Sequence, residues 1–542
     1  MFAKNRVFVI SASLIFMLVL VGAFVPEQFG YWAGKAQRVA GQYFGWLYLA
    51  SIFFFILFLL YLAFGKYGKV RLGAQDSTPE FSFFSWMNML MSAGFGVGLV
   101  FYGMAEPMIH YLDPPHQLAE AGTAEAMNLA MQYTYFHWGL SQWVAFAVVG
   151  LIVAFFQFRK DRAGLVSNMV EPVLRNVPVK MQEPMLNSLD VLAVVATVIG
   201  MATSIGLGVL QVNGGLTYVF GFGDTVKVKL LIMLCLFSCY MLSSLTGLDK
   251  GIKILSNFNM ALAFLFLGYL LVVGPTVFIL ETFVHSLGGY LSNFVNWSLT
   301  VPPQEDGTWM NQWTFFLWAW VIAWSPFVGT FIARISRGRT IQEYVFGVLI
   351  VPPLLACMWI AIVGGSAFHM EMNGVATLAA NVQENMTHAM FDLYSNMKFS
   401  MLLSIITLML VFTFLVTSAD SASYIVSQMT DHGSLNPPLY KRITWGVLLS
   451  AICLTLLATG GLGALQTASL LVAVPFIVVL FIMAWVLMVE LAEDRRLALY
   501  DLYHQNEGTP VGADIYEADE IGTPPVEERI KRRMVLKKPR LK

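Results

Sequence analysis

The sequence predicts an all-α protein that crosses a membrane many times. Of its 542 residues, 57% are hydrophobic and only 12% are charged, against roughly 25% charged residues in soluble domains. Apolar runs of about 20 residues, the length that spans a bilayer as a helix, recur along the chain. The net charge of −1 leaves no basic surface for nucleic acid. These observations exclude a soluble enzyme with one core, a disordered chain and a nucleic-acid-binding domain.

Twelve apolar segments are predicted to be membrane-spanning helices. The first is expected to be retained and not cleaved as a signal peptide, because it is long enough to span and lacks a small-residue cleavage site. Lys and Arg collect on the cytoplasmic side of membranes and therefore orient the chain. With both termini in the cytoplasm, all but five of the 32 Lys and Arg residues lie on that side, and none lies in the interior of a span, because Lys229 and Arg442 are the first residues of theirs. The predicted spans are residues 7–25, 45–64, 84–105, 129–156, 189–220, 229–246, 257–281, 312–333, 343–366, 399–427, 442–459 and 468–491.

The four cysteines are predicted to be buried, unreactive thiols, because each lies in an apolar run. They are Cys235, Cys239, Cys357 and Cys453. The sequence therefore predicts neither a metal centre nor a disulfide framework.

The C-terminal tail differs in composition from the rest of the chain. Residues 514–528 are acidic and residues 529–542 are strongly basic. Such a tail is either a solvated segment or one that binds a membrane surface or another subunit in a salt-dependent way.

The third span contains a glycine-rich interruption at residues 92–98 (SAGFGVG). Three glycines at a spacing of two cannot all be packing positions on one helix face. They favour an unwound backbone whose carbonyls can hold a cation and whose N–H groups can hold a carboxylate. Close helix packing is the alternative role for these glycines.

The tenth span carries adjacent hydroxyls and a carboxylate, which are costly in lipid. Thr417 and Ser418 are followed by Asp420. Hydroxyls and carbonyls are the oxygen ligands that Na⁺ requires, but Ser and Thr also bond to their own helix backbone. Asp420 can equally cap a neighbouring element near the cytoplasmic end.

The fifth span has two features that differ in meaning. Thr197 and Met201 lie four residues apart on one face, and Gly200, Ser204 and Gly208 form a stripe of small residues. The stripe predicts close packing against another helix.

Tryptophans cluster in the fourth and eighth spans. Trp320 and Trp324 are four residues apart and share a helix face, whereas Trp318 points elsewhere. Aromatic faces arranged as a box attract quaternary ammonium groups through cation–π interactions. We expect His137 to be a hydrogen-bonded structural histidine and not a proton carrier. Together with the broken third span, these features favour a cation-coupled carrier for a small organic solute over a channel or an enzyme.

Five strings of residues make the chain resemble the betaine/carnitine/choline transporter family over almost its full length. They are residues 93–107 (AGFGVGLVFYGMAEP), 137–143 (HWGLSQW), 196–215 (ATVIGMATSIGLGVLQVNGG), 318–339 (WAWVIAWSPFVGTFIARISRGR) and 417–421 (TSADS). The resemblance implies a secondary transporter of the LeuT-like fold in a prokaryotic inner membrane. It implies a homotrimer surrounded by lipid, with alternating access around a site at the bilayer midplane.

The resemblance also implies how the chain is divided. Two leading helices occupy residues 1–83, and two inverted repeats of five helices follow, the second with a closing helix. The repeats occupy residues 84–281 and 312–491, with a periplasmic connecting segment at 282–311 and a cytoplasmic tail at 492–542.

The family's first sodium site, carried over by position, combines backbone oxygens with two hydroxyls. It falls on Ser92, Phe95, Phe414, Thr417 and Ser418. The resemblance therefore implies Na⁺ as the coupling ion and no other cofactor. The second sodium site falls on Thr197, Met201 and Phe327. Met201 replaces a hydroxyl there, which removes one hard oxygen ligand.

The family's substrate site falls on an aromatic box and on the broken third span. Phe146 stands where a Tyr is common, and Val321 stands where the family has a second Trp that closes the box. The residues implied are Trp138, Trp143, Phe146, Val321 and Trp324, with the backbone amides of Ala93, Gly94, Phe95 and Gly96.

Three functions are compatible with these residues. The first is Na⁺-coupled uptake of a betaine-like zwitterion or quaternary ammonium solute. The second, motivated by Phe146 and Val321, is transport of a non-quaternary zwitterion such as an amino-sulfonate or amino acid. The third is an osmosensor or transceptor that depends on the charged tail.

Overall fold

The computed structural model describes residues 5–94, 96–246, 249–301 and 308–505. Throughout these residues the regular structure is helical, apart from an isolated bridge between Arg71 and Thr340. Nine of the described helices are long and apolar enough to cross a membrane, or ten if one bent pair is counted as a span. This confirms the all-α membrane class. The chain divides into two units, Met1–Phe481 and Ile482–Lys542; the last 37 residues of the predicted tail, from 506, lie outside the described part.

The two leading helices are α1 (Arg6–Phe24) and α2 (Pro26–Phe64). The predicted second span began at residue 45, so α2 is much longer than expected. Pro26 occupies the first turn of α2, where its missing N–H costs nothing and its fixed φ favours a helix. Apolarity marked only the C-terminal half of α2, because its N-terminal half carries polar residues.

The third span is broken, as predicted. Helix α3 (Phe83–Gly94) ends and α4 (Val97–Leu112) begins on either side of Gly96, whose backbone is extended at φ −121° and ψ −168°. Phe95 lies outside the described residues. A second break, which was not predicted, separates α5 (Ala124–Trp138) from α6 (Leu140–Ala154) at Gly139.

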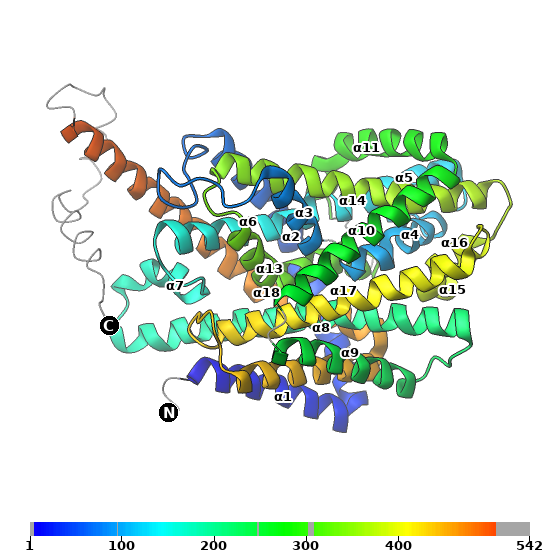
Figure 1. The fold of residues 1–542 in the computed structure, drawn as a ribbon, viewed down its shortest axis with the longest axis horizontal. Coiled ribbons are helices and arrows are strands. Elements are labelled where there is room, and N and C mark those ends of the chain that lie inside the picture. Colours follow the sequence, from blue (N-terminus) through cyan, green and yellow to red (C-terminus); the bar gives the residue numbers. More distant parts are fainter. Residues whose placement is uncertain (1–4, 95, 247–248, 302–307, 506–542) are drawn as a thin grey trace. The chain divides into compact units, whose positions relative to one another are not determined.

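The predicted seventh span, residues 257–281, is wrong at its C-terminal end. Helix α10 (Asp249–Val273) stops before Gly274, and α11 (Thr276–Leu299) turns away from it by 109°. Pro275 explains the stop, because a proline lacks the N–H that would continue the helix. Much of the segment expected to be a connection is thus helical (Figure 1).

The remaining helices complete the bundle. The predicted last two spans form one element, α18, which bends at Gly461, where φ is +57°. The long helices are α8 (Val179–Phe220), α9 (Val226–Thr246), α13 (Thr314–Ile335), α14 (Ile341–Met372), α17 (Ser400–Met429) and α18 (Leu439–Gln505). Short helices are α7 (Val166–Val170), α12 (Thr308–Gln312), α15 (Leu378–Glu384) and α16 (Ala389–Ser395), with 3₁₀ turns at Pro115–Gln117, Glu171–Asn176 and Met386–His388 and a π turn at Phe155–Arg159.

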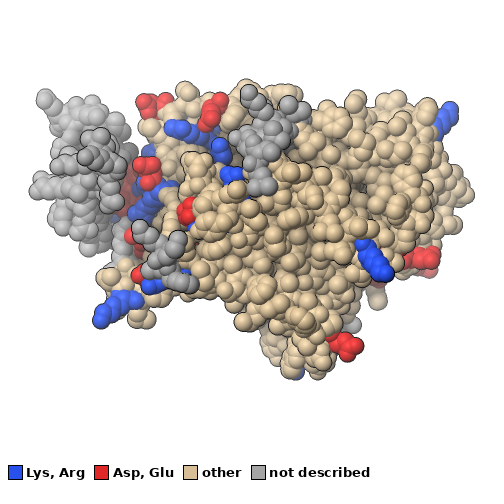
Figure 2. All heavy atoms as spheres, turned by 60° about the horizontal axis from the view of Figure 1, so that its bottom comes forward, with Lys and Arg blue, Asp and Glu red and all other residues tan. Residues whose placement is uncertain are grey.

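Helix α13 lies at the centre of the first unit. It is buried continuously from Thr314 to Gly329 and packs against α6 and α8, and α17 also packs against α8. Lys, Arg, Asp and Glu are sparse over the middle of the surface in Figure 2. Many large apolar side chains of the described residues are exposed, as is expected of a surface that faces lipid. Of the four free cysteines, Cys357 and Cys453 are buried, but the prediction is wrong for Cys235, which is exposed on α9.

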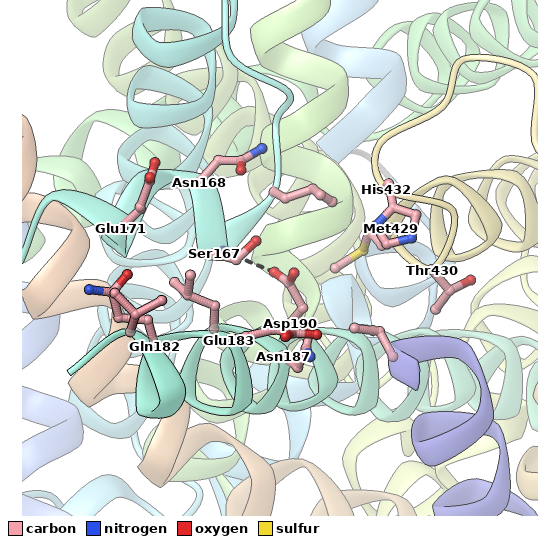
Figure 3. A pocket seen from close by; sticks show the side chains of 14 residues that line it. Ser167, Asn168, Glu171, Gln182, Glu183, Asn187, Asp190, Met429, Thr430 and His432 are labelled. Carbon is pink, nitrogen blue, oxygen red and sulfur yellow. Dashed lines mark hydrogen bonds between the residues drawn. The ribbon is translucent and has the colours of Figure 1, made fainter. Parts of the chain in front are cut away.

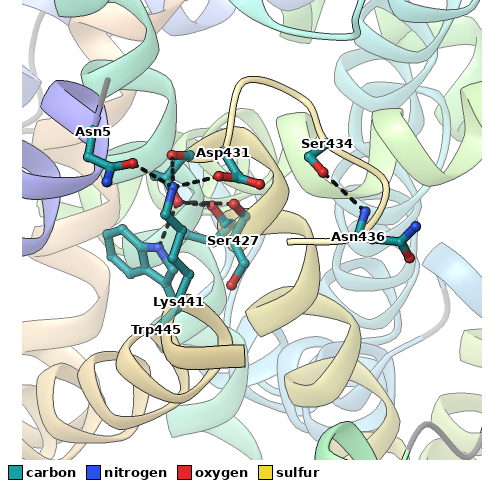
Figure 4. Close-up of polar contacts among 9 residues, drawn as sticks. Asn5, Ser427, Asp431, Ser434, Asn436, Lys441 and Trp445 are labelled. Atoms are coloured by element: carbon teal, nitrogen blue, oxygen red, sulfur yellow. Dashed lines mark hydrogen bonds and ion pairs between the residues drawn. The ribbon is translucent and has the colours of Figure 1, made fainter. Parts of the chain in front are cut away.

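The buried side chain of Lys441 forms hydrogen bonds to two other segments of the first unit (Figure 4). The Lys441 side chain has no exposure, and its Nζ donates to Asp431 Oδ1 at 2.7 Å, Thr430 O at 2.9 Å and Asn5 Oδ1 at 3.0 Å. The indole of Trp445 donates to Thr430 Oγ1 at 3.0 Å. The start of α1, the end of α17 and the start of α18 are joined by these bonds.

Candidate functional site

The break between α3 and α4 packs directly on tryptophan rings. A methyl group placed on Gly94 would overlap the ring of Trp143, and one on Gly98 would overlap Trp320 and crowd Trp138. At Gly96 the added carbon would lie 3.5 Å from Trp324. The glycines at 94 and 98 are therefore required for this close approach of backbone to ring. We call Trp138, Trp143, Phe146, Trp320 and Trp324 the aromatic cluster.

The rings of the aromatic cluster form a continuous set of contacts, and all five are buried. Trp320 and Trp324 stack with centroids 5.8 Å apart and planes 6° apart. Trp138 meets Trp320 edge-on at 6.3 Å, and Phe146 meets Trp324 edge-on at 5.4 Å. Edge-to-face and offset contacts are the favoured arrangements for aromatic pairs.

The predicted shared face of Trp320 and Trp324 is confirmed. Trp318 points elsewhere and packs on Phe136 at 5.2 Å. Trp320 was not among the predicted substrate residues, although its spacing to Trp324 pointed to it. Val321 is buried, 2% exposed, and its expected role in the site stays a prediction.

The small-residue stripe of α8 brings that helix against α13, which confirms the packing prediction. A methyl group on Gly200 would lie 2.8 Å from Trp324 N and 2.9 Å from Ala323 C, both backbone atoms. The Trp320 indole donates to Ser204 Oγ at 3.1 Å and to Gly200 O at 3.3 Å. The stripe thereby orients Trp320.

The three residues expected at a second sodium site lie around Trp324 and on α8. The Trp324 indole donates to Met201 Sδ at 2.7 Å, and Phe327 stacks on Trp324 at 6.3 Å. The Thr197 hydroxyl donates to Ala193 O in its own helix at 2.8 Å. A thioether and a ring are poor ligands for a hard cation.

Of the residues expected at the first sodium site, Phe95 lies outside the described residues and the other four lie on α3 and α17. Ser92 lies in α3 and Phe414 is buried in α17. The Thr417 hydroxyl donates to Phe414 O at 3.0 Å and to Thr413 O at 3.2 Å, which is the intrahelical bonding left open as an alternative. Asp420 accepts a bond from Ser243 of α9 at 2.8 Å and so joins α17 to α9.

A buried polar cluster that the sequence did not predict lies beside Trp138. Glu106 Oε1 lies 2.6 Å from His137 Nδ1, and Glu106 Oε2 accepts the Trp138 indole N–H at 2.7 Å. His137 Nε2 bonds Thr314 of α13 at 2.9 Å, which confirms that His137 is hydrogen-bonded. Glu106, His110 and His137 have ligand atoms within 4.8 Å of one another, close enough for a metal ion. Both carboxylate oxygens and both His137 nitrogens are, however, already bonded to protein groups.

A separate pocket of about 470 Å³ lies where α7, α8 and α17 meet (Figure 3). Asp190, Glu183, Asn187 and Met429 line it, and Asp190 Oδ1 accepts the backbone N–H of Ser167 at 2.9 Å. None of the aromatic cluster lines this pocket.

A broken membrane helix packed on a buried aromatic cluster is a feature typical of secondary transporters. The chain belongs to the betaine/carnitine/choline family of transporters, which it matches over residues 6–496. It is therefore not an enzyme. It is similar to the ectoine/hydroxyectoine transporter of Virgibacillus pantothenticus, with 49% identity over 89% of this chain and 95% of that protein.

Two further relatives are named for other substrates. The glycine betaine transporter OpuD of Bacillus subtilis (strain 168) is 43% identical over 91% of this chain and 95% of its own length. The high-affinity choline transport protein of Escherichia coli (strain K12) is 35% identical over 90% of this chain and 72% of its own length.

Proposed function

We propose that the chain imports a small betaine-like zwitterion or onium solute by alternating access, with Na⁺ as the coupling ion. The observation that carries this proposal is the packing of the aromatic cluster on the α3–α4 break. Ring faces attract an onium head by about 0.5–2 kcal/mol each. Free N–H groups at the helix break attract the solute carboxylate.

A non-quaternary zwitterion is a second candidate substrate. It is favoured by the 49% identity to a relative named for ectoine and hydroxyectoine. Ectoine is a cyclic zwitterion whose delocalised cation lacks a trimethylammonium group. Val321 replaces one Trp of the family's aromatic box and Phe146 lacks a Tyr hydroxyl, and we propose that this altered box suits a flat cation of this kind.

Sodium coupling rests on the oxygen groups of α17. The Thr417 hydroxyl and Phe414 carbonyl are adjacent at 3.0 Å, and rotation of the hydroxyl would present both to an ion between α3 and α17. Met201 provides a thioether where a second sodium site would need an oxygen ligand, so we propose that one Na⁺ is transported with each solute molecule.

The twelve-span topology also belongs to this proposal. Twelve spans result if α3–α4, α5–α6 and the bent pair α10–α11 each count as one span and α18 counts as two, on either side of Gly461. We propose the five-plus-five inverted repeat, the homotrimer and the inner membrane location from the family pattern, and the cytoplasmic termini from the distribution of Lys and Arg.

Uptake into proteoliposomes tests the proposal. Labelled ectoine, glycine betaine and choline are each supplied with and without an inward Na⁺ gradient. Trp138→Ala should abolish Na⁺-driven uptake, whereas Trp318→Ala, an equally buried ring outside the aromatic cluster, should retain it if the protein elutes as folded particles. Thr417→Ala should raise the Na⁺ concentration needed for half-maximal uptake, and Thr417→Ser should restore it. Uptake that ignores the Na⁺ gradient, or that survives Trp138→Ala, would contradict the proposal.

A further inference from the structure

Glu106 links Trp138 of the aromatic cluster, by hydrogen bonds through His137, to α13, the helix that carries Trp320 and Trp324. Its carboxylate is fully buried on α4 and accepts the Trp138 indole N–H at 2.7 Å. Its other oxygen lies 2.6 Å from His137 Nδ1, and His137 Nε2 reaches Thr314 at the start of α13. The same helix, α13, carries Trp320 and Trp324.

The hydrogen bond to Trp138 is of the strong, charge-assisted kind. A carboxylate that accepts an N–H in a low-dielectric interior makes a shorter and stronger bond than a neutral acceptor. The bond fixes the rotation of the Trp138 ring, whose far edge meets Gly98 and Trp320. Without this carboxylate, the buried indole N–H of Trp138 would lose its acceptor, which is costly in the protein interior.

The carboxylate also affects the electrostatics of the ring. Its negative charge lies at the N–H edge of the indole and draws the proton toward itself. The ring face becomes more electron-rich as a result, and the potential near the aromatic cluster becomes more negative. Both effects strengthen the attraction of the ring face for a positive head group.

We propose that Glu106 is a positioning and specificity-determining residue of the transporter, which holds Trp138 in place and makes the aromatic cluster select for positive charge on the solute. This inference rests on the proposed function, because it requires Trp138 to face the solute. Glu106 acts through Trp138 and does not itself contact the solute. His137 holds Glu106 and Thr314 holds His137, so the orientation of Trp138 depends on α13 as well as on α4.

Solutes that differ in net charge separate this role from a structural one. Choline carries a net charge of about +1 at neutral pH, whereas glycine betaine and ectoine are zwitterions. The purified full-length protein is titrated with each compound, and competition against labelled ectoine gives the three dissociation constants. Glu106→Gln keeps an acceptor for the indole but removes the charge, so it should weaken choline binding about threefold to tenfold more than ectoine binding. Asp190→Asn, the same change at a buried carboxylate away from the cluster, should alter neither.

A double-mutant cycle tests the action through Trp138. Glu106→Ala removes the acceptor and should weaken the binding of all three solutes. Trp138→Phe keeps an aromatic ring but removes the N–H that Glu106 accepts. If Glu106 acts through that N–H, Glu106→Ala should cost less than about twofold in the Trp138→Phe background. Equal losses for choline and ectoine in Glu106→Gln, or fully additive effects in the cycle, would overturn the inference. A wild-type protein that binds none of the three compounds would instead refute the proposed function.

Discussion

The contact between Gly200 and α13 gives the sharpest prediction, because the atoms opposite Gly200 are backbone and cannot rotate away. In Gly200→Ala the new carbon would lie 2.8 Å from Trp324 N, which is about 0.6 Å below the 3.4 Å at which ordinary contact begins. Relief requires α8 and α13 to separate by a similar amount. Overpacking of this kind costs about 1–3 kcal/mol.

The separation also has a functional consequence. The Trp320 indole already bonds Ser204 Oγ at 3.1 Å and Gly200 O at 3.3 Å, and a further 0.6 Å would take both beyond good hydrogen-bond distance. We therefore expect Gly200→Ala to lower both the melting temperature in detergent and the affinity for solute.

A matched glycine controls for the effect of the alanine itself. Gly268 lies within α10 and has nothing within 4 Å of the added carbon. Gly268→Ala should be neutral or stabilise by roughly 0.5–1 kcal/mol, because alanine favours a helix over glycine. Melting is followed by scanning fluorimetry on both purified variants. If Gly200→Ala melts at the temperature of Gly268→Ala and binds solute normally, the close approach of the two helices is refuted.

Three further outcomes follow from the structure. Lys441→Met should lower the free energy of unfolding by about 1–3 kcal/mol, because Asp431 and the other acceptors lose their buried donor; chemical unfolding in detergent measures this, and an unchanged midpoint would contradict it. Met201→Thr restores an oxygen beside Trp324, so the Hill coefficient for Na⁺ in uptake assays should rise from about one toward two, and no rise would exclude a latent second site. Burial raises the pKa of Asp392 in α16 above the unfolded value of 3.8. The carboxyl group of Asp392 therefore binds its proton more tightly in the folded state than in the unfolded state. The contribution of Asp392 to the free energy of unfolding is largest at low pH and is lost as the pH rises through the raised pKa. Asp392→Asn should flatten this part of a melting curve against pH; an unchanged slope would rule the effect out.

The long apolar spans and the broken third helix could be predicted because their signals are local. A bilayer selects for apolar length, and three glycines in alternation disfavour a helix at that point. The turn at Pro275 was available in the sequence but was missed, because the apolar run continues through it to residue 281. The N-terminal half of α2 was not predicted because it contains polar residues, so the apolar run begins later than the helix does.

The site was predicted where periodicity places residues on one face and was missed where partners come from different helices. Trp320 and Trp324 are four residues apart, and their stacking follows from helix geometry. Glu106 and His137 are 31 residues apart, and Thr314 lies on a third helix. No local pattern in the sequence joins these three side chains.

Two buried charges with several partners, Glu106 and Lys441, both lie just beyond the ends of predicted spans. The third span was expected to end at residue 105, immediately before Glu106, and the eleventh to begin at residue 442, immediately after Lys441. In the structure α4 continues through Glu106 to Leu112, and α18 begins two residues before Lys441. A charge ends an apolar run by hydropathy, but a helix can continue through it when other helices supply hydrogen-bond partners that offset the cost of burial. His137 and Trp138 do so for Glu106, and Asn5, Thr430 and Asp431 do so for Lys441. Charges at the apparent ends of membrane spans are therefore the positions at which to look for buried networks, and here one such network reaches the aromatic cluster.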